Sequence, residues 1–138
     1  MARILAFDYG LKRTGLAVTD PLQIITSTLD TVDTTTVISY VQKYLTTETV
    51  ELFLLGIPIR EDGRTSHSTP HILKFKEELE KTFPSITVLL RDESYTSQQA
   101  MQVLIKNGTK KSKRREKGSL DKVSAAIILQ EYLEEKSL

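Results

Sequence analysis

The chain of 138 residues is long enough to bury one hydrophobic core and too short for two ordinary domains, so we predict a single domain over residues 1–138. It contains no cysteine, which excludes disulfides, thiolate zinc sites and a cysteine nucleophile and fits a reducing compartment. No apolar run reaches the length of a membrane span and the N-terminus lacks a signal-peptide pattern, so we expect a soluble, cytoplasmic protein with no membrane contact.

The formal net charge of +1 hides an uneven distribution. Residues 106–117 contain seven Lys or Arg residues and one acid, a local charge of +6, whereas the rest of the chain carries −5. A positive segment in an otherwise acidic protein can bind a polyanion, although a charge run can equally be a solvated loop. We predict that residues 106–119 form a basic, mobile loop within the domain.

The first half of the chain predicts three strands and a helix. Residues 4–7 are continuously apolar, which is typical of a strand buried on both faces, and this strand ends at Asp8. Residues 15–18 predict a strand that returns beside it, and residues 23–29 a third, weaker strand. A helix should follow with Asp33 as its N-cap. Short connections between the three strands favour an antiparallel meander.

The second half alternates strands with helices. Residues 51–56 and 86–90 predict two further buried strands, separated by a helix that begins with Thr69 and Pro70. A helix with a capping box at Thr96 and Gln99 should follow the last strand. The final helix is predicted from Leu120, after the N-cap Ser119, to about Lys136.

The resulting order, β-β-β-α-β-α-β-α-α, predicts an α/β fold. Its mixed five-stranded sheet has an antiparallel part extended by parallel strands, with helices on both faces. Active sites in such folds form at the edge where the parallel strands end.

Three acids are predicted to converge at that edge. Asp8 ends the first strand, and Glu93 lies just beyond the last strand. Asp121 shares a face of the final helix with Ala125, Ile128 and Tyr132, which we expect to be buried. The polar arc of this helix is expected at Ser124, Gln130, Glu131 and Glu134.

Three carboxylates without His or Cys suit a hard divalent cation, Mg²⁺ or Mn²⁺. Two such ions can activate water and stabilise the leaving oxygen in phosphodiester hydrolysis. Each acid also has a purely structural alternative: Asp8 could form an Asx-turn, Glu93 a cap, and Asp121 a favourable contact with the helix dipole. Lys12 and Arg13 could contact phosphates, or they could occupy a solvated hairpin tip.

Four segments together resemble the YqgF-like family, and the resemblance covers nearly the whole chain. They are Asp8-Tyr-Gly10 with the turn up to Asp20, Gly56-Ile-Pro58 with Asp62-Gly63, Asp92-Glu93, and the run from Leu120 to Ala126. The resemblance implies a ribonuclease H-like fold and a hydrolase acting on ester bonds, an endo- or exonuclease. It implies processing of the 5′ end of pre-16S rRNA in ribosome biogenesis, or Holliday junction resolution in DNA recombination and repair.

The resemblance also implies roles for particular residues. Asp8, Glu93 and Asp121 would be the catalytic, metal-binding acids, and the basic loop would lie on the substrate side. We assign substrate binding to five cations: Lys12, Arg13, Lys113, Arg114 and Arg115. The expected partners are structured RNA or branched DNA and a ribosomal precursor particle, with the protein a monomer or weak homodimer.

One residue departs from the family pattern. Ser94 follows Asp92-Glu93 where the family usually has Arg, so a guanidinium that could bind phosphate beside the acids is missing. A non-catalytic nucleic-acid-binding module is therefore an alternative. A sugar-kinase or actin-like ATPase is disfavoured, because those proteins need a second large domain.

Overall fold

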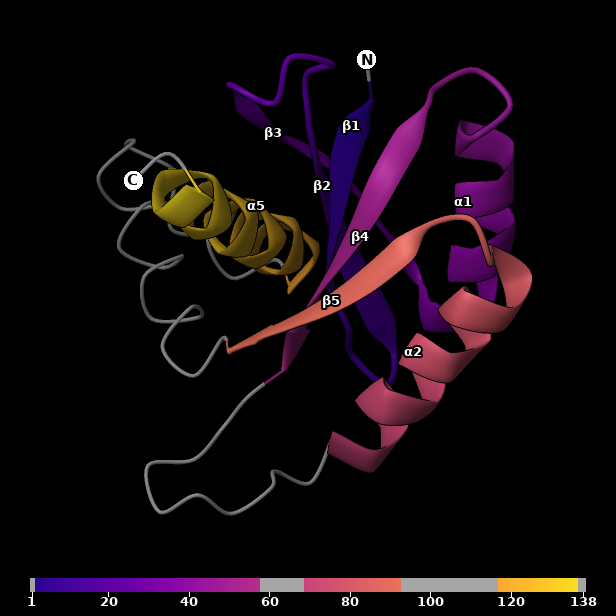
Figure 1. Ribbon diagram of the computed structural model, residues 1–138. Helices are drawn as coiled ribbons and strands as arrows, with labels where there is room; N and C mark the ends of the chain where they lie inside the picture. The colour runs from indigo at the N-terminus through magenta and orange to yellow at the C-terminus, as the bar shows by residue number, and fades with distance from the viewer. Residues whose placement is uncertain (1, 58–68, 93–116, 137–138) are drawn as a thin grey trace.

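The computed structural model describes residues 2–57, 69–92 and 117–136, with side chains in the last range from residue 122 onward. One mixed sheet of five strands organises this part of the chain, in the order β3-β2-β1-β4-β5 (Figure 1). The elements in chain order are β1 (Arg3–Asp8), β2 (Arg13–Thr19), β3 (Thr26–Asp33), η1 (Thr34–Thr36), α1 (Val37–Tyr44), β4 (Val50–Ile57), α2 (Thr69–Thr82), β5 (Thr87–Asp92) and α5 (Lys117–Lys136). The predicted mixed sheet of the ribonuclease H-like fold is confirmed.

Strand β1 lies at the centre of the sheet. It pairs antiparallel with β2 and parallel with β4, and β5 continues the parallel side. Its side chains alternate between two cores: Leu5 and Phe7 pack against α1 and α2, whereas Ile4 and Ala6 pack against α5. The continuous apolar run is therefore explained by helices on both faces.

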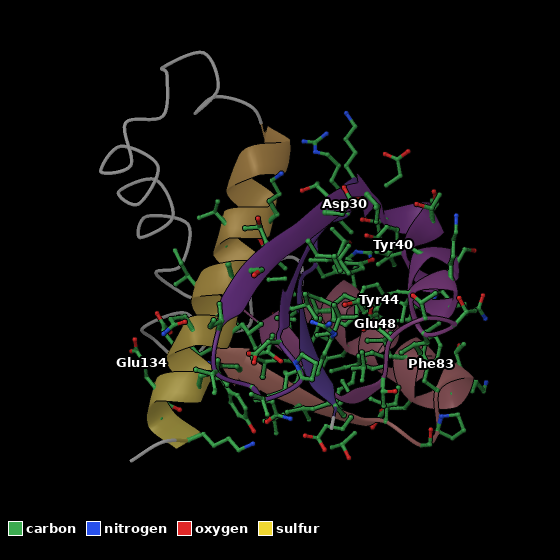
Figure 2. All side chains as sticks on the ribbon, turned by 90° about the horizontal axis from the view of Figure 1, so that it is seen from above. Asp30, Tyr40, Tyr44, Glu48, Phe83 and Glu134 are labelled. Carbon is green, nitrogen blue, oxygen red and sulfur yellow. The ribbon has the colours of Figure 1, made fainter. Side chains whose placement is uncertain are left out.

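The core beneath α1 and α2 is rich in aromatic rings. Phe7 makes edge contacts with Phe53 and with Phe75 of α2, with ring centroids 5.5 and 5.6 Å apart. The helix predicted from Thr69 is confirmed, and Ile72, Phe75 and Leu79, which recur at helical spacing, are all buried on it. Figure 2 shows α5 on one side of the sheet and α1 on the other.

The core beneath α5 contains small side chains. Ala6 and Ala17 of the sheet and Ala125 of the helix are all fully buried, together with Ile128 and Leu129. Small residues on both surfaces let the helix backbone approach the sheet closely, as interdigitated packing requires. No helix among the described residues has the length and apolar character needed to span a membrane.

The third strand begins three residues later than predicted and ends four residues later. It begins at Thr26 and runs to Asp33, whereas residues 23–25 belong to the preceding turn. The Asp20 carboxylate accepts hydrogen bonds from the backbone N–H groups of Leu22, Ile24 and Ile25, and residue 23 adopts a positive φ of 59°. These contacts hold a turn that the local Ile-Ile-Thr sequence does not reveal.

Three further predictions for helices and strands need correction. Strand β5 is an edge strand, so only Val88 of it is buried and Leu89 is 40% exposed, in contrast to the buried strand predicted. Helix α5 begins at Lys117, three residues before the predicted start. Ser124 is buried rather than part of the polar arc, because it lies one helical turn before Ile128, on the face of α5 that packs on the sheet. The helix predicted from Thr96 lies outside the described residues.

Candidate active site

The carboxyl ends of β1, β4 and β5 meet at one edge of the sheet. Phe7 pairs with Leu55, which in turn pairs with Leu90, so the three parallel strands are in register. Asp8 is the last residue of β1 and is half-buried, and Asp92 is the last residue of β5. The structure thus puts Asp8 where it was predicted, at the edge at which α/β folds build their sites. Glu93 follows Asp92 directly in sequence but lies outside the described residues.

Helix α5 packs against β1, β2 and β3 on one face of the sheet. Its last residue donates a hydrogen bond from Lys136 Nζ to Gln23 Oε1 at 2.9 Å, and Gln23 Nε2 donates to the Ala2 carbonyl, beside the start of β1. The same end of the helix also reaches the other end of the sheet, because Glu135 accepts two hydrogen bonds from Arg91 near the end of β5. These contacts place the end of α5, and the position of Asp121 relative to Asp8 stays a prediction.

Residue 121 lies in the second turn of α5, because the helix starts at Lys117. The favourable effect of a helix N-terminus on an acid fades within the first turn. The position therefore weakens the structural alternative for Asp121. Asp121 was predicted to share a buried face of the helix with three later residues. That face is confirmed for these residues, since Ala125 and Ile128 are fully buried and Tyr132 is partly buried.

Of the three proposed metal ligands, Asp8 has a described side chain. Among residues whose side chains are described, no three His, Asp or Glu side chains form a group that could hold a metal ion. Glu93 and the side chain of Asp121 are outside that set, so the triad stays a prediction. Asp8 is a suitable ligand for a hard divalent cation, because its carboxylate oxygens lie at the carboxyl edge of the sheet.

Two predicted phosphate-binding cations lie in the turn that follows Asp8. Lys12 is exposed, and Arg13 is half-buried at the start of β2, opposite Asp33 of β3. The structure brings both to the same edge as Asp8, since Asp8 pairs with Gly15 across the hairpin. The other three predicted cations, at positions 113–115, lie outside the described residues.

The β1–β2 turn, residues 9–13, is tightly built. A side chain at Gly10 would place its Cβ only 2.4 Å from the Arg13 carbonyl oxygen, so this position requires glycine. The Tyr9 ring packs on the Phe75 ring with centroids 4.9 Å apart, and burial, together with the charge of Glu78, raises the pKa of Tyr9. The turn between Asp8 and the two cations is therefore anchored to α2.

Arg91 has a role that the sequence did not reveal. Its guanidinium donates two hydrogen bonds to the Glu135 carboxylate, at 2.6 and 2.7 Å, and lies 3.6 Å from a carboxylate oxygen of Glu131. Hydrogen bonding to Glu135 raises the pKa of Arg91, and the same contact lowers the pKa of Glu135. This ion pair fastens β5, two residues before Glu93, to α5. The one indication in the sequence is the alternation of side chains along a strand, which places Arg91 on the same face of β5 as Leu89.

A cavity of about 340 Å³ lies away from this edge. It is lined by residues at the end of α1 and just after it: Tyr40, Lys43, Tyr44, Thr46 and Thr47. The Arg3 N–H donates to the Thr49 carbonyl, so this segment borders the start of β1 rather than its end. The cavity is therefore separate from the candidate active site.

Comparisons with known proteins agree with the motifs. Residues 2–135 match the family model described as "RuvX: Holliday junction resolvase". Three proteins, each named "Putative pre-16S rRNA nuclease", are similar over nearly their whole length. The protein of Porphyromonas gingivalis is 48% identical over 134 residues, 97% of either chain. That of Christiangramia forsetii is 49% identical over 135 residues, covering 98% of this chain and 100% of its own. That of Flavobacterium psychrophilum is 45% identical over 136 residues, 99% of either chain. The chain therefore belongs to the RuvX family, the YqgF-like family that its motifs resemble.

Proposed function

We propose that this protein is a metal-dependent nuclease that processes the 5′ end of pre-16S rRNA in ribosome biogenesis. The observation that carries the proposal is Asp8 at the carboxyl edge of the sheet with Lys12 and Arg13 in the adjoining turn. The names of the similar proteins support pre-16S rRNA as substrate. The proposal assigns the activity to one domain over residues 1–138, acting in the cytoplasm on a ribosomal precursor particle.

Asp8, Glu93 and Asp121 would hold Mg²⁺ or Mn²⁺. Ions bound there would lower the pKa of a water molecule and neutralise charge at the leaving oxygen. The residues of the chain supply positioning. Lys12 and Arg13 bind phosphate groups on either side of the scissile bond, and the anchored turn keeps them at a fixed distance from Asp8. The basic segment, residues 106–119, whose last three residues belong to α5, adds electrostatic attraction for the RNA backbone.

Holliday junction resolution is the second candidate, and the description of the matching family model favours it. Metal-dependent hydrolysis makes no use of the 2′-hydroxyl, so the same acids could cleave DNA. The two candidates differ in substrate shape rather than in chemistry.

A cleavage assay separates these candidates. We would compare a pre-16S rRNA leader, a four-way DNA junction and single-stranded controls, each with Mg²⁺, with Mn²⁺ and with chelator. The proposal expects cut leader with metal, and an intact leader beside a cut junction would favour the resolvase.

Asp8→Asn should abolish cleavage while leaving the protein folded, because it removes a metal ligand but keeps the size of the side chain. Asp33→Asn is the matched control, since Asp33 is an exposed acid opposite Arg13 at the same edge. A leader cut equally well by wild type and Asp8→Asn would overturn the proposed site.

A further inference from the structure

Thr34, the first residue after β3, makes three hydrogen bonds to the β1–β2 turn and its flank. Its backbone N–H donates to the Lys12 carbonyl at 3.0 Å. Its hydroxyl donates to the Gly10 carbonyl at 2.5 Å and lies 2.9 Å from the hydroxyl of Thr14. One residue outside the turn therefore holds the turn at two points and its flank at a third.

The direction of these bonds follows from the donor count. A threonine hydroxyl has one hydrogen, and that of Thr34 is given to Gly10, so Thr14 must donate to Thr34. Thr14 is fully buried, so its hydroxyl has no access to water as a substitute partner. Removing the Thr34 hydroxyl would leave both a carbonyl and a buried hydroxyl without these partners, which is costly.

We propose that Thr34 is a positioning residue, which fixes the turn that carries Lys12 and Arg13 relative to Asp8. The inference rests on the proposed nuclease function and deepens it. The contacts of Thr34 fix the carbonyls of residues 10 and 12, while the Lys12 side chain stays exposed and free to meet a phosphate. Thr34 thus sets substrate affinity without touching the substrate.

Two substitutions, Thr36→Val and Thr34→Ser, provide matched controls. Thr35 and Thr36 are exposed, and the Thr36 hydroxyl donates only to the Asp33 carbonyl, three residues earlier. Thr36→Val therefore removes a hydroxyl of the same kind from the same 3₁₀ turn without touching the β1–β2 turn. Thr34→Ser keeps the hydroxyl and should restore the wild-type behaviour that Thr34→Val loses.

The test compares cleavage kinetics of wild type, Thr34→Val, Thr34→Ser and Thr36→Val on the pre-16S rRNA leader. A shifted binding group costs between about tenfold and hundredfold. We expect a rise of that size in KM for Thr34→Val with a much smaller change in kcat, and wild-type values for the other two variants. Wild-type KM in Thr34→Val would overturn the inference, as would an equal rise in Thr36→Val.

A second readout needs no activity. The backbone N–H of residue 34 still donates to Lys12 in the valine variant, so its hydrogen exchange reports whether the turn has loosened. Faster exchange in Thr34→Val than in Thr36→Val supports the inference, and equal exchange overturns it. A wild-type protein that cuts no substrate would refute the proposed function, while this readout would still decide the role of Thr34.

If Thr34→Val does not fold, Thr14→Val tests the same hydrogen bond by removing the Thr14 hydroxyl instead. It removes the donor to Thr34 and keeps the Thr34–Gly10 bond, so the same changes should appear at smaller size. Unchanged KM and exchange in a folded Thr14→Val would then overturn the inference.

Discussion

Enlarging Ala125 tests the close contact between α5 and the sheet. Ala125 has no exposed surface and packs in a cluster with Ile4, Ala6 and Ala17 of the sheet. Ala125→Leu adds three carbon atoms where no space exists, and such overpacking costs about 1–3 kcal/mol in the free energy of unfolding. Ala126→Leu makes the same change one residue later, at a half-buried position, and should cost less than about 1 kcal/mol.

The consequence reaches the proposed site because Asp121 lies one helical turn before Ala125. A helix displaced by about 1 Å should reduce cleavage by up to about a hundredfold, since positioning errors of that size have such effects. Urea denaturation of both variants gives the stability difference, and the leader assay gives the activity. Equal stability of the two variants would refute the close packing, and a destabilised Ala125→Leu with full activity would show that α5 carries no catalytic acid.

Three further variants test the charges and the metal. Replacing Lys113, Arg114 and Arg115 by Ala should lower the slope of log affinity against log salt by about 1 for each phosphate that the protein no longer neutralises, and an unchanged slope would mean a merely solvated loop. Glu135→Gln should lower the melting temperature near neutral pH, because the hydrogen bond with Arg91 lowers the pKa of Glu135 in the folded protein. The ionised Glu135 therefore stabilises the fold at any pH above the ordinary pKa of a glutamate, and this stabilisation is lost as the pH falls through the lowered pKa. The difference in melting temperature between wild type and Glu135→Gln should therefore vanish in acid. Mg²⁺ at about 100 times its Kd should stabilise wild type by about 2.7 kcal/mol but not Asp121→Ala. An effect of the helix dipole alone would instead cost about 0.3–1 kcal/mol with or without Mg²⁺.

The central part of the fold could be predicted because the relevant signals are local. The apolar run before Asp8 defines β1, and it is buried as predicted. The helical spacing of Ile72, Phe75 and Leu79 defines the buried face of α2. Alternation and periodicity follow from backbone geometry, so they do not depend on knowledge of distant contacts.

The features that were predicted wrongly depend on contacts outside the local pattern. Residues 23–25 have the composition of a strand, but the Asp20 carboxylate holds them in a turn. The apolar run of β5 does not distinguish a central strand from an edge strand, because that depends on which strands pair. The ion pair between Arg91 and Glu135 joins residues 44 positions apart, so no local spacing indicates it.

In the candidate site too, some residues are indicated by the local sequence and others depend on contacts between distant segments. The position of Asp8 at the edge of the sheet could be predicted because it ends a recognisable strand, and the positions of Lys12 and Arg13 because they follow it directly; the roles of all three stay predictions. Thr34 could not, because it stands in a run of three threonines with nothing in the sequence to distinguish it from the other two. Its role depends on the return of β3 beside β2, which brings it to the β1–β2 turn.

If Lys12 and Arg13 bind the substrate as proposed, the absence at position 94 of the Arg that the family pattern predicts should give the β1–β2 turn a larger share of that binding. Arg91 does not replace it, because its guanidinium is engaged by Glu135 and Glu131 of α5. Among the residues assigned to substrate binding, the described cations at the edge are then Lys12 and Arg13.

Ser94→Arg should therefore tighten binding of the leader RNA, and Lys12→Ala should weaken it less in that background than in wild type. Each charged hydrogen bond to phosphate is worth about 1.5–3 kcal/mol, so either change is at least about tenfold in Kd. Affinities of the two single variants and the double variant, measured at one salt concentration, form a complete cycle. Strictly additive effects would show that residue 94 and the turn do not share a phosphate, and the absence of the family arginine would then carry no consequence for the role of Lys12.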